Sequence, residues 1–147
     1  MLEFKIIRED SDFSSDFLRN DFINFLHKHL ERFGDTKEAI SKSIDYAFSH
    51  DEGKGGFLLI AYNDNEIVGE LVMNRTGMQE YIPENILVYV AVDGASRGKG
   101  YGGEICKKAI EISDGNVALH VEYDNPAKKL YERLGFKTKY AEMRLTK

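Results

Sequence analysis

The residues with the clearest chemical potential form a glycine-rich run, Arg97-Gly98-Lys99-Gly100-Tyr101-Gly102-Gly103. It follows an almost wholly apolar stretch, residues 86–92, which predicts an interior strand. It precedes an apolar stripe at helical spacing, made of Ile105, Ala109 and Ile112. Between a strand and a helix, missing Cβ atoms let backbone N–H groups converge, and the helix N-terminus adds partial positive charge. Such a turn suits a phosphate or pyrophosphate, and Arg97 and Lys99 add formal positive charge.

Two other kinds of phosphate-binding loop fit this run poorly. A nucleoside-triphosphate loop needs Ser or Thr after Gly-Lys to hold magnesium, but Gly98-Lys99 is followed by Gly100. A dinucleotide loop matches at Gly98, Gly100 and Gly103, and Glu122 stands where a ribose-binding acid belongs. However, residues 93–97 separate the strand from the first glycine, and only 25 of the 147 residues follow Glu122. The residues after Glu122 are too few for the remaining strand–helix units of a dinucleotide-binding domain. The interpretations that fit better are a coenzyme site and a turn that binds nothing.

Two motifs together resemble a known family. The segment Val90-Ala91-Val92-Asp93-Gly94-Ala95-Ser96-Arg97-Gly98-Lys99-Gly100-Tyr101-Gly102 is similar to the signature of the GNAT superfamily of acyl-CoA-dependent N-acyltransferases. The core of that signature is Arg or Gln, two residues, Gly, one residue, then Gly or Ala, which Arg97, Gly100 and Gly102 satisfy. The segment Ala127-Lys128-Lys129-Leu130-Tyr131-Glu132-Arg133-Leu134-Gly135-Phe136 resembles the second signature, in the order that the family has.

The resemblance implies acetyl-CoA as co-substrate and no metal. The amides from Gly98 to Gly103 would hold the pyrophosphate, and the backbone of Val90 and Val92 would pair with the pantetheine arm, where the central strand diverges from its neighbour. A backbone N–H near Val90 or Ala91 would meet the acyl carbonyl. The residues implied to bind the coenzyme are Val90, Ala91, Val92, Arg97, Gly98, Lys99, Gly100, Tyr101, Gly102, Gly103, and Asp124 or Asn125 near a family asparagine position.

Tyr131 matches the family tyrosine near the coenzyme sulfur, so the resemblance implies a general acid that protonates the departing thiolate. The alternative is a packing role at the edge of its helix. The family often places a glutamate base on the central strand, but this chain is apolar there, near Ile86. Glu122 or Glu84 is the tentative base, and the further candidates are Glu70, Tyr89 and His120. Cys106 is expected to pack in a helix interior.

Hydrophobic periodicity predicts the elements that must position these residues. Strands are expected at 4–8, 57–62, 67–73, 86–92, 117–123 and from Phe136 onward. Helices are expected over 18–33, after an N-cap at Asp35, after the glycine run, and from Pro126 to Leu134. Asn63-Asp64-Asn65-Glu66 predicts a hairpin turn. The pattern indicates an α+β protein, and the resemblance implies a GNAT-like fold with a mixed central sheet of six to seven strands and about four helices.

Composition limits the broad class of protein. The 147 residues fit a single domain, 1–147, and 42% apolar with 31% charged residues is typical of a globular chain. The net charge of −5 argues against a nucleic-acid partner, and the single cysteine excludes an internal disulfide. No apolar stretch approaches the roughly 20 residues of a membrane span, and no signal-peptide pattern opens the sequence. We therefore expect a cytoplasmic protein, and homodimers are common in the family that it resembles.

The leading functional prediction is an N-acetyltransferase that moves an acetyl group from acetyl-CoA to a primary amine by direct attack on the thioester. The alternatives are a catalytically inactive acyl-CoA-binding regulatory module and a nucleotide-dependent oxidoreductase. The resemblance implies that the two N-terminal helices, residues 50–56 and residues 75–85 surround the acceptor. Glu80 and Glu84 in the last segment suit a cationic amine. Small amines, polyamines, aminoglycosides and peptide N-termini all stay open.

Overall fold

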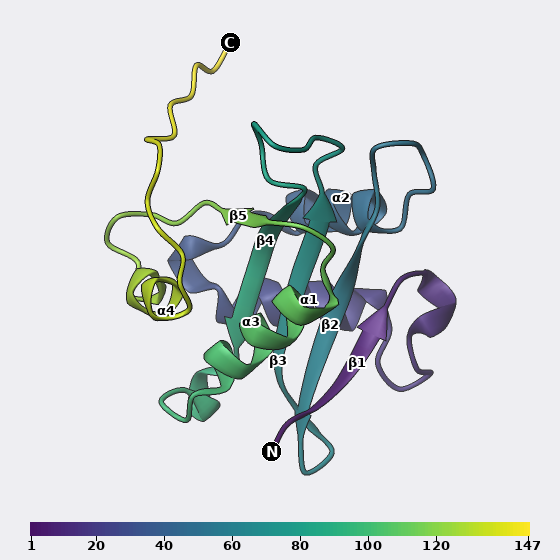
Figure 1. Ribbon diagram of the computed structural model, residues 1–147. Coiled ribbons are helices and arrows are strands. Elements are labelled where there is room, and N and C mark those ends of the chain that lie inside the picture. Colours follow the sequence, from purple (N-terminus) through teal and green to yellow (C-terminus); the bar gives the residue numbers. More distant parts are fainter.

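The centre of the molecule is a five-stranded sheet in the order β1-β2-β3-β4-β5, seen in a computed structural model that describes residues 1–147 (Figure 1). Strands β1 (Glu3–Ile7), β2 (Gly56–Asn63), β3 (Glu66–Arg75) and β4 (Asn85–Val92) are antiparallel neighbours. Strand β5 (Val117–Leu119) pairs parallel with β4. A parallel pair needs a crossover connection, which is supplied here by helix α3 (Tyr101–Ile112). The sheet is therefore mixed, because β4 pairs antiparallel with β3 on one side and parallel with β5 on the other.

Helices cover both faces of the sheet. Helices α1 (Arg19–His29) and α2 (Lys37–Ala47) lie behind it in Figure 1, and α3 and α4 (Ala127–Arg133) lie on the other side. The apolar core is divided in the same way into two clusters. One cluster joins α1 and α2 to the sheet, and the other joins α3 to it. Phe22, Leu26, Ile40 and Ile44 are fully buried in the first, and Ile105 and Ala109 in the second.

The β2–β3 hairpin confirms the predicted turn. Asp64 and Asn65 have φ values of +50° and +66°, the left-handed conformation that a two-residue hairpin of type I′ needs at both positions. Asn and Asp tolerate this conformation better than other side-chain residues. The predicted strands on either side are also present, β2 longer by two residues and β3 by three.

Several predicted boundaries are wrong. The sheet has five strands rather than six to seven, because no strand follows Phe136; β5 also ends at Leu119 instead of Tyr123. The chain leaves the sheet after α4 (Figure 1), so this segment has no partner edge with which to pair its N–H and C=O groups. Helix α1 ends at His29 and a separate 3₁₀ turn covers Glu31–Phe33. Thr36, not Asp35, caps α2, since its Oγ1 accepts a hydrogen bond of 3.1 Å from the Ala39 N–H.

Candidate active site at the β4 edge

Gly98 and Gly100 shape the turn between β4 and α3. Both have φ of +82°, and Gly100 is the N-cap of α3. A Cβ at either position would meet no heavy atom within 4 Å, so space does not explain these glycines. Their backbone conformation does, because a left-handed φ is unfavourable for most side-chain residues. The turn thus leaves the backbone at the N-terminus of a 12-residue helix uncovered, where an anion is favoured.

Gly102 and Gly103 have a different role. A Cβ on Gly102 would lie 3.1 Å from Leu130 Cδ2, and one on Gly103 would lie 3.5 Å from Leu130 Cδ1. Since Leu130 belongs to α4, Gly102 lets the first turn of α3 lie close against that helix, whereas a Cβ on Gly103 would make only an ordinary contact. The glycine run therefore both shapes a turn and joins the two signature motifs in space.

The edge of β4 beside this turn is open. Strand β5 pairs only with Asn85–Leu87, and β4 continues for five more residues. The Asp93 N–H donates to the Val68 carbonyl at 2.8 Å, and hydrogen bonding alternates along an antiparallel strand. Ala91 and Tyr89 therefore direct their backbone groups toward β3, whereas Val90 and Val92 direct theirs toward the open edge. A β-bulge at Val88, where Val72 pairs with Tyr89 but Met73 pairs with Leu87, bends β4 at this point.

Tyr131 stands on the α3–α4 side of this edge. It is 8% exposed and belongs to the same apolar cluster as Val90 and Val92, with its ring centroid 6.0 Å from that of Phe136. Burial, with a smaller contribution from Cys106, raises the pKa of Tyr131 above the ordinary value of a tyrosine. The phenol is therefore fully protonated at neutral pH. Cys106 is fully buried, and burial raises the pKa of its thiol to about 12, so it carries no reactive thiolate.

Of the two candidate bases, Glu84 is held by backbone amides and Glu122 is exposed. Glu84 Oε1 accepts the Asn116 N–H at 2.7 Å and Oε2 accepts the Glu80 N–H at 3.3 Å, and these backbone hydrogen bonds lower the pKa of Glu84. Glu84 also precedes β4, about 20 Å of extended strand from Val90. Glu122 is exposed in the turn before α4, where its carbonyl accepts the Asn125 N–H at 3.0 Å. His120 and Glu122 lie beyond the end of β5, so no strand face aligns them.

Asp124 and Asn125 are engaged with the protein itself. Asn125 Oδ1 accepts the Ala127 N–H at 2.9 Å and so supports the start of α4. Asp124 Oδ2 lies 3.0 Å from the Arg32 guanidinium, which joins this loop to the 3₁₀ turn after α1. The sequence did not indicate either contact.

Arg97 turns away from the glycine run toward the end of α1. Its Nη1 donates to Glu31 Oε1 at 3.0 Å and its Nη2 donates to the His29 carbonyl at 2.7 Å. His29 Nδ1 accepts the Gly94 N–H at 3.1 Å, while its Nε2 lies 3.3 Å from Asp93 Oδ1. Burial lowers the pKa of His29. These contacts fix the turn to α1 and neutralise the charge of Arg97, and Lys99 is left with no ion pair.

Two buried side chains lie on the α1–α2 side of the open edge. The Tyr89 hydroxyl donates to Asp35 Oδ2 at 2.6 Å, across 54 residues of sequence. Glu70 on β3 pairs with Ala91 and is fully buried, and neither carboxyl oxygen has a hydrogen-bond partner. Burial raises the pKa of Glu70 well above its ordinary value. Tyr89 and Glu70 were named from the sequence only as further base candidates, and Asp35 only as a helix cap.

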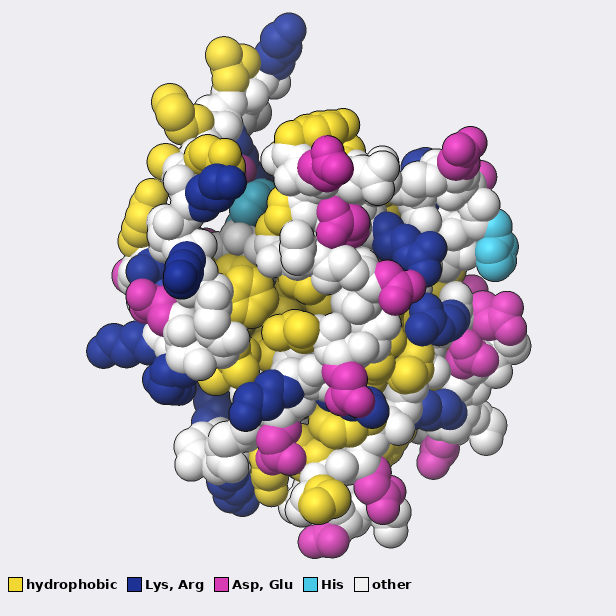
Figure 2. Space-filling view, viewed as in Figure 1, with side chains coloured by type: hydrophobic (Ala, Val, Ile, Leu, Met, Phe, Trp, Pro, Cys, Tyr) yellow, Lys and Arg dark blue, Asp and Glu magenta, His cyan; other side chains and the backbone are white.

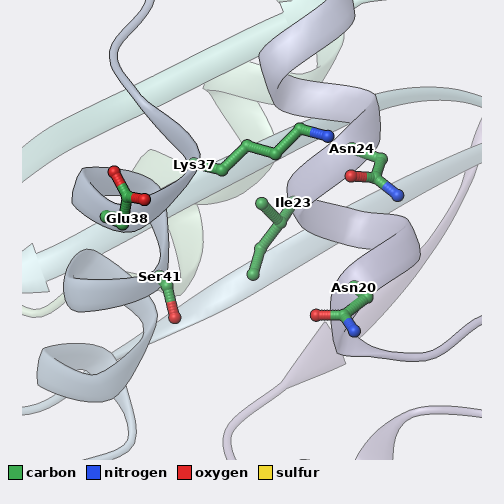
Figure 3. A pocket seen from close by; sticks show the side chains of 6 residues that line it. All are labelled: Asn20, Ile23, Asn24, Lys37, Glu38 and Ser41. Carbon is green, nitrogen blue, oxygen red and sulfur yellow. The ribbon is translucent and has the colours of Figure 1, made fainter.

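The surface shows two further features. In Figure 2, Lys and Arg side chains are frequent on the side of α4 and the glycine-rich turn, with acidic groups among them. A groove between α1 and α2, with a volume of about 360 Å³, is lined by Asn20, Ile23, Asn24, Lys37, Glu38 and Ser41 (Figure 3). It therefore offers amides and charges of both signs. None of the helices is long and apolar enough to cross a membrane.

Comparison with solved structures shows the fold. The chain has a TM-score of 0.67 and 18% identity to a possible acetyltransferase from Clostridium difficile 630, covering 99% of this chain and 97% of that one. A transcriptional regulator from Bacillus halodurans C-125 gives 0.66 and 20%, covering 98% and 99%. A ribosomal-protein-alanine N-acetyltransferase from Brucella melitensis biovar Abortus 2308 gives 0.62 and 17%, covering 99% of each chain. No curated protein sequence matches the chain.

The family follows from the sequence itself. Residues 54–138 match the model of the acetyltransferase (GNAT) domain. This match contains β2 to α4, and with them the open β4 edge, the glycine-rich turn and Tyr131. The chain therefore belongs to the GNAT acetyltransferase family.

Proposed function

We propose that this protein transfers an acetyl group from acetyl-CoA to a primary amine by direct attack of the amine on the thioester. The observation that carries the proposal is the open edge of β4 at Val90 and Val92, which leads directly to the anion-binding turn before α3. An extended arm with a pyrophosphate at one end matches this combination of an unpaired strand edge and a helix N-terminus.

The residues present fit the coenzyme. The amides from Gly98 to Gly103 would hold the pyrophosphate, supported by the left-handed turn at Gly98 and Gly100 and by the open space around both. The free Lys99 ammonium adds positive charge, whereas Arg97 would act by fixing the turn to Glu31 and His29. The Val90 and Val92 backbone would hold the pantetheine arm, with Ala91 beside them and Tyr101 in the first turn of α3. Asp124 and Asn125 would shape the loop before α4, Asp124 through its contact with Arg32 and Asn125 through its hydrogen bond at the start of α4.

The chemistry needs a neutral amine, an activated acyl group and a proton for the leaving sulfur. The coenzyme supplies the activated acyl group as a thioester. The amine nitrogen forms the new C–N bond, the C–S bond breaks, and Tyr131 gives its phenolic proton to the sulfur. Direct transfer is supported by Cys106, because a fully buried thiol with a raised pKa does not form an acyl-enzyme.

The acceptor is proposed to be cationic in its resting form. Glu80 and Glu84 lie in the segment before β4, and the net charge of the chain is −5, which favours the approach of an ammonium group. The structurally similar Brucella protein is a ribosomal-protein-alanine N-acetyltransferase, so a peptide N-terminus belongs among the acceptors to test beside small amines, polyamines and aminoglycosides. We propose that the chain acts as one domain in the cytoplasm.

The test is release of free coenzyme A thiol from acetyl-CoA across this panel of amines, with acetylation of the amine confirmed by mass spectrometry. The no-amine reaction measures hydrolysis and is the baseline. Thiol release that depends on an amine is the expected result. Tight coenzyme binding with no release on any amine would instead identify an inactive acyl-CoA-binding module.

A further inference from the structure

We propose that Tyr89 and Asp35 form a proton relay that takes up the proton lost by the attacking amine. The inference rests on the proposed acetyl transfer and names the proton acceptor for it. It is carried by the hydrogen bond of 2.6 Å between the Tyr89 hydroxyl and Asp35 Oδ2, at the point where β4 leaves β5.

The position of Tyr89 in the strand places it beside the reacting group. It follows the bulge at Val88 and precedes Val90, whose backbone N–H faces the open edge. The side chain of Tyr89 packs in the α1–α2 cluster, whereas Tyr131 packs in the α3–α4 cluster. The two phenols therefore lie on opposite sides of the same strand edge. An amine that attacks on the Tyr89 side needs a proton acceptor there. A sulfur that leaves on the Tyr131 side needs a proton donor there.

The relay supplies what neither residue supplies alone. Burial and the hydrogen bond to Asp35 raise the pKa of Tyr89, so at neutral pH it is a phenol and not a phenolate. A phenol accepts a proton only if it passes its own proton on. Asp35 accepts it, because its carboxylate already holds the Tyr89 O–H, and Asp35 is exposed and can return the proton to water.

Atoms and protons balance in this transfer. The amine nitrogen bonds to the acyl carbon and its proton moves to the Tyr89 oxygen, while the Tyr89 proton moves to Asp35. The C–S bond breaks, and the sulfur takes the proton of Tyr131. Asp35 then releases its proton to water and Tyr131 regains one from water, so each residue ends as it began. The products are an amide and free coenzyme A.

The other acids near β4 do not suit this task. Glu70 lies on the same face, beside Ala91, but it is fully buried and neither carboxyl oxygen has a hydrogen-bond partner, so it has no route by which to pass a proton on to water. Glu84 is held by two backbone amides at the far end of β4. Asp35 is thus the acid that is exposed to water and also accepts a hydrogen bond from a buried side chain of β4, that of Tyr89.

The experiment compares Tyr89→Phe, Asp35→Asn, their double variant and Asp35→Ala with Tyr62→Phe. Tyr62 is a matched control, because it is a half-buried tyrosine packed against the same apolar cluster but has no carboxylate as a hydrogen-bond partner. Turnover is measured with the best amine of the panel, coenzyme A affinity by calorimetry, and folding by thermal denaturation.

Each of Tyr89→Phe and Asp35→Asn should lower kcat about 100-fold, in the range of general acid–base catalysis, with coenzyme A affinity unchanged. The double variant should be no worse than either single variant, since the two residues act as one unit. Added formate should restore part of the kcat of Asp35→Ala, which a structural role would not predict. Tyr62→Phe should retain full turnover.

Full turnover in Tyr89→Phe or Asp35→Asn would overturn the relay alone, as would additive losses, absence of formate rescue, or a parallel loss of coenzyme affinity. Failure of the wild-type protein to acetylate any amine would overturn the proposed function, and the relay with it. The two failures are therefore distinct.

Discussion

At the scale of single residues, Tyr131 combines deep burial with a position beside the open strand edge. Its raised pKa makes the phenol a weaker acid than an exposed tyrosine and keeps it protonated at neutral pH, as the proposed proton donor to the coenzyme sulfur must be. At 8% exposure the ring also packs in the apolar cluster on the α3–α4 side, a role that needs no proton transfer. Removing the phenolic oxygen of Tyr131 should therefore lower turnover if the residue is catalytic and leave turnover unchanged if it only packs.

Tyr131→Phe should lower kcat about 100-fold while coenzyme A affinity changes little, because only the transition state uses the proton. The measurement is steady-state kinetics with calorimetric titration of coenzyme A. Tyr123→Phe is the control, since Tyr123 lies in the preceding loop and is 82% exposed. Unchanged turnover in Tyr131→Phe would leave Tyr131 as a packing residue only.

Glu70→Leu should raise the free energy of unfolding at pH 7 by about 1–3 kcal/mol, because it replaces a fully buried carboxyl without hydrogen-bond partners by an apolar side chain. The measurement is urea denaturation. The exposed Glu66, on the same strand, is the control, and Glu66→Leu should change stability by no more than about 0.5 kcal/mol.

The advantage of Glu70→Leu should also depend on pH. Burial, with a smaller contribution from Asp21, raises the folded-state pKa of Glu70 above its unfolded value of about 4.3. Between these two pKa values the folded wild-type protein binds more protons than the unfolded one, so its stability falls as the pH rises. The difference between variant and wild type should therefore grow from pH 4 toward neutrality, and a constant difference would contradict a protonated, buried Glu70.

At the scale of elements, the glycine-rich run has two structural tasks that the motif does not separate. Gly98 and Gly100 make the left-handed turn, while Gly102 allows close contact between α3 and Leu130 of α4. Arg97 then fixes the whole turn to the end of α1 through Glu31 and His29. The shape of this turn thus depends on α1, α3 and α4, and not only on the loop that carries the motif.

Gly100→Ala should destabilise the protein by about 1–2 kcal/mol, because alanine resists the φ of +82° found there. Gly103→Ala is the matched change within α3, where φ is helical and the new Cβ would meet Leu130 at an ordinary 3.5 Å. It should be neutral or stabilise by up to about 1 kcal/mol through helix propensity. Thermal denaturation of both variants tests this, and equal effects would show that backbone conformation is not the constraint at Gly100.

At the scale of the whole molecule, helices cover both faces of the sheet, and the open edge of β4 leads to the uncovered N-terminus of α3 (Figure 1). A ligand that spans both should stabilise the folded state, because it binds the native chain and not the unfolded one. The length of the arm, and not only the phosphate, then decides which nucleotide cofactor binds.

Acetyl-CoA should therefore raise the melting temperature, whereas NAD should not. At a free concentration 100 times its dissociation constant, a ligand adds about 2.7 kcal/mol of stability, which corresponds to roughly 5–10 °C for a chain of this size. Differential scanning fluorimetry with both ligands and with adenosine diphosphate as a phosphate control measures this. A rise in melting temperature with NAD alone would instead support a dinucleotide-binding loop at Gly98, Gly100 and Gly103.

The sequence alone determined the local features of this protein. The hairpin at Asp64 and Asn65, the strand over 86–92, the helix after the glycine run and the family itself were all readable, because periodicity, turn chemistry and glycine placement act over a few residues. The tertiary structure decided the rest. Where β5 stops, what Arg97 contacts and how Tyr89 meets Asp35 across 54 residues depend on which segments the fold brings together. A side chain such as Asp35 suits a helix cap and a phenol equally well, so only the packing of α1 and α2 on the sheet could select between them.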